Sequence, residues 1–459
     1  MEKVETLRRT DPAGDTARLA EFAAGLRYED IPAPVLERAR NTMCDTVGAI
    51  VFGYGLPWSQ MIVDYALAYG RGGPSRILGP GGPAVQPPMA ALANGALAHA
   101  FELDGATKPS AGVHPSATIL PAILAIAQER NLSGRDLMTA FVAGTEVVVR
   151  VGRATRRTNE ARGFHAPGTS GPFGAAVAVG RLLGFDAAKM TNAIGIAGSL
   201  SSGLVQFSRS KTGGMVKRLH FGRASEGGVL AASLADRGFT GPHNVLEGQL
   251  GFLNAFCNSP DVSQLTRGLG EDYLVMSIYM KRYVCHGQAQ IPLQALEDLR
   301  TEHRFTADDV ESIVVLGSED LVDRHDLRNP PDPMLAQYSV PFSVAVSFFR
   351  DPRDPRSFDH SAIADPRIKA LIERIRLGHE DAEKYGSKAV SVTVTLKDGR
   401  VLSRRLSSFK GTPEAPPTRE DVREKFMLLT RDCPSAKMTE IFDRLQGVER
   451  ETSFDWLAF

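Results

Sequence analysis

The sequence predicts a mainly α-helical protein with a smaller α+β part. Three successive patterns along the 459 residues support this fold class. From about residue 15 to 256, apolar side chains recur every three or four positions, as on helices that pack in a core. After about residue 279 alternating apolar and polar residues indicate strands, and beyond residue 413 the helical period returns. We therefore expect a helical domain, an α+β domain and C-terminal helices that complete the helical domain, at 1–278, 279–412 and 413–459.

The expected helices of the first segment are bounded by Gly or Pro, and several contain small residues at close spacing. Small side chains let helix backbones approach closely, so we expect a crowded helical core. The helices are predicted at 34–52, 57–69, 88–101, 134–154 and 188–200.

The strongest signal in the α+β segment is a hairpin at 388–397 and 400–406. Its two alternating runs meet at Asp398-Gly399, a dipeptide typical of tight hairpin turns. A strand is also expected at 310–317. The remaining helices are predicted at 338–349 and 366–376 and, after a connector at 410–417, at 419–429 and 436–445.

Composition excludes several classes of protein. The 53 Lys and Arg residues balance 53 Asp and Glu residues, which argues against nucleic acid as a partner. The four cysteines are far apart and form neither a disulfide framework nor an iron–sulfur motif. The charged N-terminal segment lacks the apolar stretch of a signal peptide, and no window reaches the roughly 18 apolar residues of a membrane span. We expect a cytoplasmic protein with no membrane partner.

Glycine and histidine patterns argue against a bound cofactor or metal. The glycine-rich stretch 70–82 is not followed by the G-K-[ST] of a phosphate loop, so we expect a structural loop. Gly168, Gly171 and Gly174 follow a His-Ala-Pro segment instead of a strand and are assigned to helix packing. The ten histidines show no zinc-ligand spacing. The expected chemistry uses side chains alone.

Four segments place rare polar residues beside Gly, Pro and small residues. They are His99-Ala-Phe-Glu-Leu-Asp104 with His114-Pro115-Ser116, Gly163-Phe-His165-Ala-Pro-Gly168, Gly214-Met-Val-Lys217-Arg-Leu-His220, and Tyr279-Met-Lys281-Arg-Tyr-Val-Cys285-His286 with Gln337-Tyr338. In this order and spacing, the segments resemble the MmgE/PrpD family, which includes 2-methylcitrate dehydratase, cis-aconitate decarboxylase and iminodisuccinate epimerase. The resemblance covers residues 15 to 450.

The resemblance implies a helical domain built from both ends of the chain, an inserted α+β lid and a homodimer. It also implies an active site, whose catalytic positions fall on His114, His165, Lys217, Lys281 and Tyr338, with an acidic residue at Glu102 or Asp104. The family's Asp-x-Asp-Asp-Thr-like segment reads Glu102-Leu-Asp104-Gly105-Ala106-Thr107 here. Substrate binding is expected to involve Thr107, Arg218 and Arg282.

These residue types suit a small polycarboxylate substrate. Desolvated carboxylates need cations, which Lys217, Arg218, Lys281 and Arg282 would supply. The same cations would stabilise the charge that develops when a proton leaves a carbon next to a carboxylate. Histidines act as acid and base near neutral pH, and Tyr338 could donate a proton or hydrogen bond. The sequence therefore predicts a cofactor-independent lyase or isomerase.

Several alternatives stay open at this point. We favour a hydro-lyase acting on a 2-methylcitrate-like acid, over a cis-aconitate-like decarboxylase or an iminodisuccinate-like epimerase. A carboxylate-binding protein without catalysis is the alternative of another class. Taken singly, His114 could cap a helix and the lysines could lie in solvent. His220 and His286 are assigned to packing or support, and Cys285 to the core.

Overall fold

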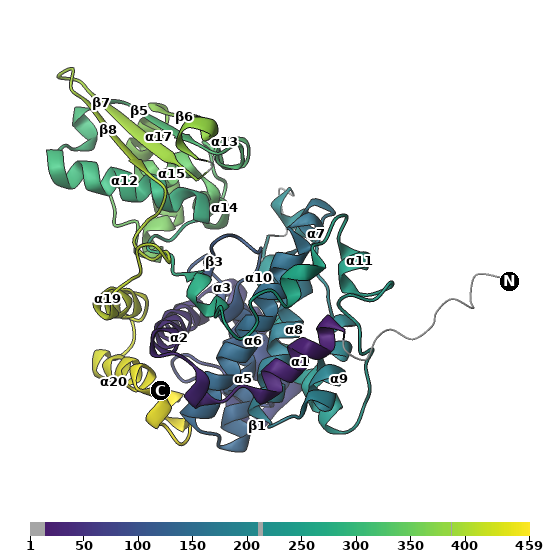
Figure 1. Cartoon of the computed structure of the whole chain (residues 1–459). Coiled ribbons are helices and arrows are strands. Elements are labelled where there is room, and N and C mark those ends of the chain that lie inside the picture. Colours follow the sequence, from purple (N-terminus) through teal and green to yellow (C-terminus); the bar gives the residue numbers. More distant parts are fainter. Residues whose placement is uncertain (1–13, 210–213, 387) are drawn as a thin grey trace. The chain divides into compact units, whose positions relative to one another are not determined.

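The computed structural model describes residues 14–209, 214–386 and 388–459, and it is mainly helical with small sheets, as predicted (Figure 1). Its residues form two compact units. The helical unit runs up to Ala100 and includes Asp104–Ile278 and Thr430–Phe459, and the α+β unit comprises Phe101–Leu103 and Tyr279–Leu429. Residues 1–13, which contribute to the expectation that no export signal is present, lie outside the described residues.

The helical unit contains twelve of the described α-helices and short strands. The helices are α1 (Asp15–Gly25), α2 (Ala33–Tyr54), α3 (Pro57–Gly70), α4 (Pro87–Ala98), α5 (Pro115–Arg130), α6 (Gly134–Thr155), α7 (Thr158–Ala161), α8 (Ala166–Leu182), α9 (Ala187–Gly198), α10 (Val216–Asp236), α11 (Phe252–Phe256) and α20 (Ser435–Gln446). Short 3₁₀ helices lie at Tyr28–Asp30, Val205–Ser208, Val262–Leu265, Leu274–Ser277, Val448–Arg450 and Asp455–Leu457. The short strands are β1 (Arg71–Arg76), β2 (Ala84–Val85), β3 (Ala106–Thr107) and β4 (Ile278–Tyr279), the last of which ends at the boundary with the other unit.

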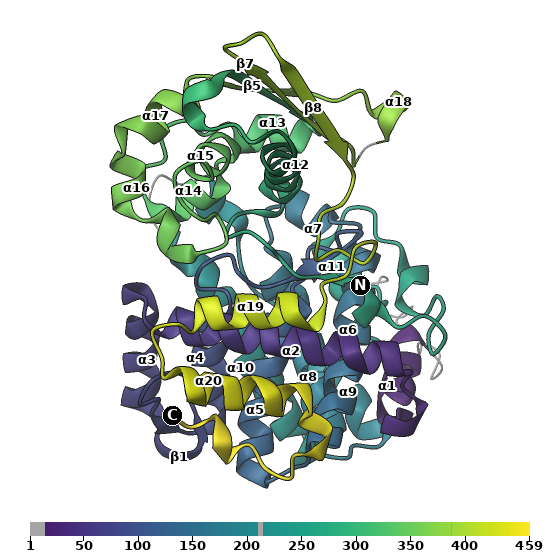
Figure 2. The same cartoon turned by 90° about the vertical axis from the view of Figure 1, so that its left-hand side faces the viewer.

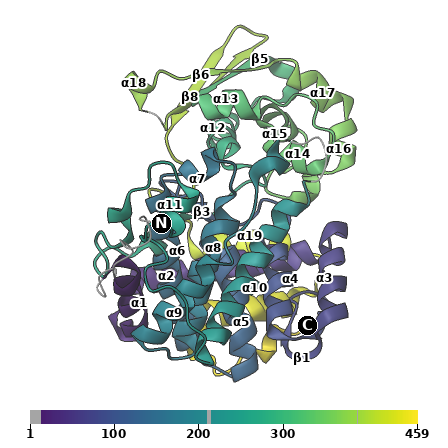
Figure 3. The same cartoon turned by 90° about the vertical axis from the view of Figure 1, so that its right-hand side faces the viewer.

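The core of the helical unit is the packing of α8 and α10 against their neighbours (Figure 3). Helix α8 contacts α5, α6, α9 and α10, and α10 also contacts α4. Glycines permit these approaches. A Cβ on Gly222 of α10 would lie 2.3 Å from the carbonyl oxygen of Leu92 in α4, and a Cβ on Gly171 of α8 would lie 2.7 Å from Cβ of Ala224. This confirms that Gly171 serves helix packing.

The glycine-rich stretch 70–82 is not simply a loop. Its first part forms β1, which pairs antiparallel with β2. The sequence pattern missed this pair because Gly and Pro in the stretch hide the alternation by which a strand is recognised.

The α+β unit consists of one four-stranded sheet and eight α-helices among the described residues. The strands are β5 (Val310–Gly317), β6 (Ile375–His379), β7 (Val390–Leu396) and β8 (Val401–Leu406). The helices are α12 (Gly287–His303), α13 (Glu319–His325), α14 (Pro333–Tyr338), α15 (Val340–Val346), α16 (His360–Ala364), α17 (Pro366–Ile372), α18 (Ala382–Tyr385) and α19 (Arg419–Leu429). Short 3₁₀ helices lie at Ala307–Asp309 and Pro355–Phe358.

The sheet has the order β6-β5-β7-β8, with β6 parallel to β5 and the other neighbours antiparallel. Strands β7 and β8 form the predicted hairpin, and Gly399 in its turn has a φ of +88°, which favours glycine. Helices α12, α13 and α15 pack against one face of the sheet (Figure 2). Alternation along the strands thus separates a buried face from the opposite one.

Two predicted helices of this unit are wrong in part. The helix expected at 366–376 ends at Ile372, and β6 begins at Ile375. Strand β6 depends on pairing with β5, which lies about sixty residues away in the chain and which a local pattern does not reveal. The helix expected at 338–349 is shorter in the structure: Tyr338 ends α14, and α15 covers Val340–Val346. The hydroxyl of Ser339 accepts a hydrogen bond from the N–H of Phe342 and so starts α15.

The boundaries of the units also differ from the expected domains at two places. Helix α19 was expected to complete the helical domain, but it belongs to the α+β unit. Its Lys425 donates a hydrogen bond of 2.8 Å to the carbonyl of Leu103, and Arg356 donates to the carbonyl of Leu428. The segment Phe101–Leu103 belongs to the same unit, although it lies far upstream in the chain.

Among the described helices, no single one is both long and apolar enough to span a membrane. Helices α2 and α3 meet the criterion only when taken together, and they are bent by 92° relative to each other.

Candidate active site

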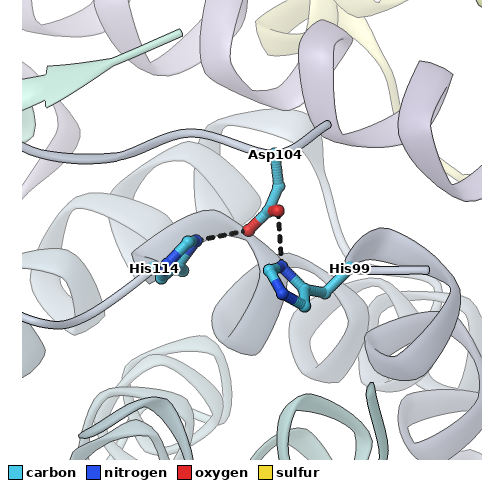
Figure 4. A group of neighbouring side chains, drawn as sticks. All are labelled: His99, Asp104 and His114. Carbon is cyan, nitrogen blue, oxygen red and sulfur yellow. Dashed lines mark hydrogen bonds and ion pairs between the residues drawn. The ribbon is translucent and has the colours of Figure 1, made fainter. Parts of the chain in front are cut away.

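A buried carboxylate in the helical unit joins two histidines (Figure 4). Oδ1 of Asp104 lies 2.6 Å from Nδ1 of His99, and Oδ2 lies 2.7 Å from Nδ1 of His114. Asp104 and His99 are almost completely buried, whereas 17% of the His114 side chain is exposed. His114 occupies the position before α5, but its ring does not cap that helix. The capping alternative for His114 is therefore wrong.

The bridge determines the charge and the tautomers of this group. Burial alone would raise the pKa of Asp104, but the two histidine rings hold it well below its ordinary range. An ionised carboxylate only accepts hydrogen bonds, so the Nδ1 atom of each ring must carry hydrogen. Proton exchange by His114 is thereby directed to its Nε2 atom. The carboxylate also stabilises the imidazolium that forms when this atom gains a proton.

Close helix packing positions the first histidine. His99 follows α4, and its ring stacks on Phe221 of α10 at a centroid distance of 3.8 Å. A Cβ on Gly95 would lie 2.9 Å from Cα of Gly222, so α4 and α10 nearly touch one turn before His99 and directly next to Phe221. Phe221 also meets His114 edge-on at 5.3 Å. The aromatic ring therefore holds both imidazoles of the bridge in place.

A second pair of histidines lies near Phe221 in the same unit, where the His165 ring meets the Phe221 ring edge-on at 5.9 Å. Nδ1 of His165, at the start of α8, is 2.9 Å from Nδ1 of His220 in α10. Two neutral imidazoles share such a bond only if one Nδ1 carries hydrogen and the other does not. Burial, followed by the charge of Lys217, lowers the pKa of His165 well below its usual value and that of His220 to about 4. Both rings are therefore neutral near pH 7.

The first turn of α10 carries the cations predicted for this unit. Lys217 is only 6% exposed, so the alternative of a solvated lysine is wrong here. Its Nζ lies 6.0 Å from the ring of Phe207, which also meets His165 edge-on. The structure thus brings Lys217 into the same aromatic and histidine group. Because it lies four residues before Phe221, it shares a face of α10 with that ring.

Two predicted substrate-binding residues, Arg218 and Thr107, form contacts within the protein. Arg218 donates hydrogen bonds to the carbonyls of Ala100 and Gly214, and its guanidinium lies over the ring of Trp58. The hydroxyl of Thr107 accepts a hydrogen bond from the N–H of Ala111. These contacts orient the chain around Asp104.

Three predicted residues meet in the α+β unit. Nζ of Lys281 lies 2.9 Å from Oε2 of Glu102 and 3.0 Å from its carbonyl oxygen. The hydroxyl of Tyr338 donates to Oε1 of the same glutamate at 3.2 Å. Glu102 has a φ of +52°, a strained conformation for this residue type, which the contacts to its side chain and carbonyl help to maintain. Lys281 is 2% exposed, so it too is not a solvated lysine.

Stacked rings support Tyr338. Nδ1 of His325 lies 2.7 Å from the carbonyl oxygen of Tyr338, and the ring of His286 stacks on both of these residues. Burial lowers the pKa of His325, so its Nδ1 donates as a neutral imidazole. The prediction that His286 has a supporting role agrees with this arrangement.

Arg282 and Cys285, which are close to Lys281 in the sequence, form hydrogen bonds with other residues. Arg282 points to Glu297, at 3.3 Å, and does not join the predicted binding cations. Burial raises the pKa of the Cys285 thiol to about 12, which makes it a poor nucleophile and agrees with its assignment to the core.

One cluster in the described part of the chain has the spacing of metal ligands. Donor atoms of His99, Asp104 and His114 lie within 4.8 Å of one another. Both Nδ1 atoms, however, bond to the carboxylate oxygens at hydrogen-bond distance. A metal bound at these atoms would have to displace both hydrogens and break the bridge, so the donor set fits a proton relay better than a metal.

Sequence reasoning missed His99 and Phe221 as members of the group. His99 stands five residues before Asp104 in a segment that was singled out, but nothing local shows that the two side chains meet. Phe221 could have been found from its spacing of four from Lys217 on one helix face.

Comparisons with known proteins agree with the sequence resemblance. Residues 17–265 match the MmgE/PrpD N-terminal domain, and residues 283–446 match the MmgE/PrpD C-terminal domain. The chain is 27% identical to a cis-aconitate decarboxylase of Aspergillus terreus over 467 residues, covering 96% of this chain and 94% of the relative. It is 26% identical to the cis-aconitate decarboxylase of Mus musculus, covering 95% and 91%, and 25% identical to that of Homo sapiens, covering 90% and 86%.

Proposed function

This chain belongs to the MmgE/PrpD family, and we propose that it is a cofactor-independent lyase that decarboxylates a small tricarboxylate of the cis-aconitate type. Relatives that carry this activity in their names align with nearly the whole chain. They favour decarboxylation over the 2-methylcitrate-like dehydration and the epimerisation that the sequence left open. The observation that carries the proposal is the buried Asp104 carboxylate held between His99 and His114.

The proposed reaction needs one proton. In a cis-aconitate-like acid, a carboxymethyl group is attached to a carbon–carbon double bond. When its bond to the carboxylate carbon breaks, CO₂ leaves and the electron pair shifts into a new double bond. The former double-bond electrons then form a bond to a proton at the far carbon, next to another carboxylate. No oxidant or reductant is required.

His114 is proposed to deliver this proton from Nε2. Asp104 holds the opposite nitrogen and stabilises the protonated ring, which is the form that an acid must have before transfer. The lowered pKa values of His165 and His220 keep both rings neutral near pH 7. They therefore carry no positive charge that would attract the substrate's carboxylates.

Lys217 and Lys281 are proposed to neutralise carboxylates of the substrate, and Tyr338 to donate a hydrogen bond. Both lysines are buried, in surroundings where an unpaired carboxylate would be costly. Lys281 already forms an ion pair with Glu102, so a substrate carboxylate would have to share or exchange that partner. Replacement of either lysine by Ala is expected to lower turnover by about a hundredfold or more.

The test is turnover of cis-aconitate in D₂O, followed by NMR and mass spectrometry without added metal. Release of CO₂ and a five-carbon product with one deuterium at carbon are expected. His114→Asn should abolish most turnover, whereas His360→Asn, at an exposed position, should not.

The same assay separates the alternatives. Parallel incubations contain citrate, 2-methylcitrate, iminodisuccinate and tartrate. Water loss from 2-methylcitrate without CO₂ release from cis-aconitate would replace the proposal with a dehydratase, and epimerisation of iminodisuccinate would replace it with an epimerase. Binding without CO₂ release, water loss, epimerisation or deuterium incorporation would indicate a carboxylate-binding protein without catalysis.

A further inference from the structure

A pocket of about 450 Å³ lies within the α+β unit and shares no lining residue with the Glu102, Lys281 and Tyr338 group. One face of α12 and the turn at 347–353, which follows α15, form most of its wall. Its volume is within the range of sites for small molecules. The apolar part of the wall comes from Leu293, Phe305 and Pro352.

Most charges around this pocket are already matched. Arg353 forms two hydrogen bonds of 3.0 Å to the two oxygens of Asp351. Arg350 donates to Asp359 at 2.9 Å. The two oxygens of Glu297 accept from Arg282, at 3.3 Å, and from the hydroxyl of Tyr283, at 2.6 Å.

Arg300 is the exception. Its Nη1 donates to the carbonyl of Ser347 at 2.7 Å, and its guanidinium lies 4.6 Å from the centre of the Phe348 ring. In the part of the chain that the structure describes, it forms no hydrogen bond or ion pair with a carboxylate. Burial lowers the pKa of Arg300, which reflects the cost of holding this charge out of water.

We propose that this pocket binds a small monocarboxylate with an apolar body, whose carboxylate pairs with Arg300. The contacts to Ser347 and Phe348 hold the guanidinium plane, so little rotamer freedom remains to be lost when an anion binds. Among the arginines that line this pocket, Arg300 is the one with no described carboxylate at hydrogen-bond distance; the charge of Glu297 acts on it only from farther away, so a single ligand carboxylate can pair with it directly. The apolar wall accounts for the rest of the ligand.

The experiment is a titration of the full-length protein with para-fluorophenylpropionate, observed by fluorine NMR. The neutral amide of the same acid is the control for apolar binding alone. We expect the acid to bind and the amide to bind at least about tenfold more weakly, because a charge-assisted hydrogen bond is lost. Arg300→Gln is expected to weaken binding of the acid by a similar factor.

Matched variants keep the test decisive. Arg324→Gln removes an exposed arginine of α13 in the same unit and should leave binding unchanged. If Arg300→Gln fails to fold, Arg300→Lys takes its place in the test. This variant keeps the charge but not the planar fork of the guanidinium, so it should bind the acid with intermediate affinity. Equal binding of acid and amide, no binding of either at millimolar concentrations, or unchanged binding in the folded Arg300 variants would overturn the proposal.

Discussion

Asp104 accepts hydrogen bonds from two imidazoles, and this double role makes its replacement by Asn informative. An amide offers one acceptor oxygen and one donor nitrogen, so it can accept from only one of the two Nδ1–H groups. Asp104→Asn is expected to lower kcat by roughly 10²–10⁴ while changing KM less, because proton transfer contributes about that factor. Steady-state kinetics on cis-aconitate measure both constants. Asp64→Asn, at an exposed position on α3, is the control, and a wild-type kcat in the Asp104 variant would contradict the proposed relay.

The lowered pKa of His220 predicts how the free energy of unfolding depends on pH. Burial lowers its pKa from 6.5 to about 4, so between these values the unfolded chain binds a proton that the folded chain does not. The free energy of unfolding therefore falls as the pH falls through this window and is unaffected above it. Urea unfolding at pH 7 and pH 5 should show a smaller loss of stability in His220→Gln than in the wild type. Equal losses in His220→Gln and the wild type would contradict the shift.

For single residues, the sequence singled out several side chains that the structure brings together, but it did not reveal most of their contacts. His114 and Asp104 were singled out from rare polar residues in apolar segments, and the structure joins them. The sequence could not show that Arg218 turns to backbone carbonyls and Arg282 to Glu297, because both choices depend on partners distant in the chain.

Among the elements, the crossing of α4 and α10 depends on glycine. A Cβ on Gly222 would lie 2.3 Å from a backbone oxygen of α4, which cannot move aside as a flexible side chain could. Gly222→Ala is expected to lower the free energy of unfolding by roughly 1–3 kcal/mol or more through overpacking. It should also lower turnover, because the stacked rings of His99 and Phe221 follow directly from this crossing.

Gly25→Ala is the matched control for that prediction. Gly25 ends α1, and a Cβ there would meet nothing within 4 Å. The unfolding free energy should therefore change by only about 0.5 kcal/mol, in either direction. Chemical denaturation of both variants gives the comparison, and equal stability of the two would show that the crossing tolerates a methyl group.

Elements with a strong local pattern were predictable, and those that depend on distant partners were not. The strand at Val310–Gly317 and the hairpin at Asp398-Gly399 carry their signals in their own residues. Strand β6 has only five residues and is recognisable as a strand only beside β5. Helix α19 is held by a hydrogen bond from Lys425 to the carbonyl of Leu103 and by one from Arg356 to the carbonyl of Leu428. The apolar periodicity of the helix does not indicate either partner.

For the whole molecule, we expect turnover to survive exhaustive chelation. The one described cluster with metal-ligand spacing, His99, Asp104 and His114, uses its Nδ1 and carboxylate atoms for hydrogen bonds. Activity measured after dialysis against EDTA should equal that of the untreated protein. Loss of activity that a divalent ion restores would show that the cluster binds a metal.

We also propose that the protein is a homodimer. Helix α3 exposes Met61, Tyr65 and Tyr69 at a spacing of four, which forms an apolar stripe of the kind that marks interfaces. Light scattering at micromolar concentration should give twice the mass of one chain. Tyr65→Lys should shift the mass toward one chain if the stripe is buried between copies, and a single-chain mass for the wild type would exclude the dimer.

The segment Phe101–Leu103 limits how evolution or an engineer could exchange the two units. Its Glu102 holds Lys281 and Tyr338, yet it is encoded far from the rest of the α+β unit. A chimera that transplanted only Tyr279–Leu429 from a relative would combine a foreign lysine and tyrosine with the host's own residue 102. The module that can be inherited intact is therefore discontinuous in the gene, and a successful graft must carry three codons from one place and 151 from another.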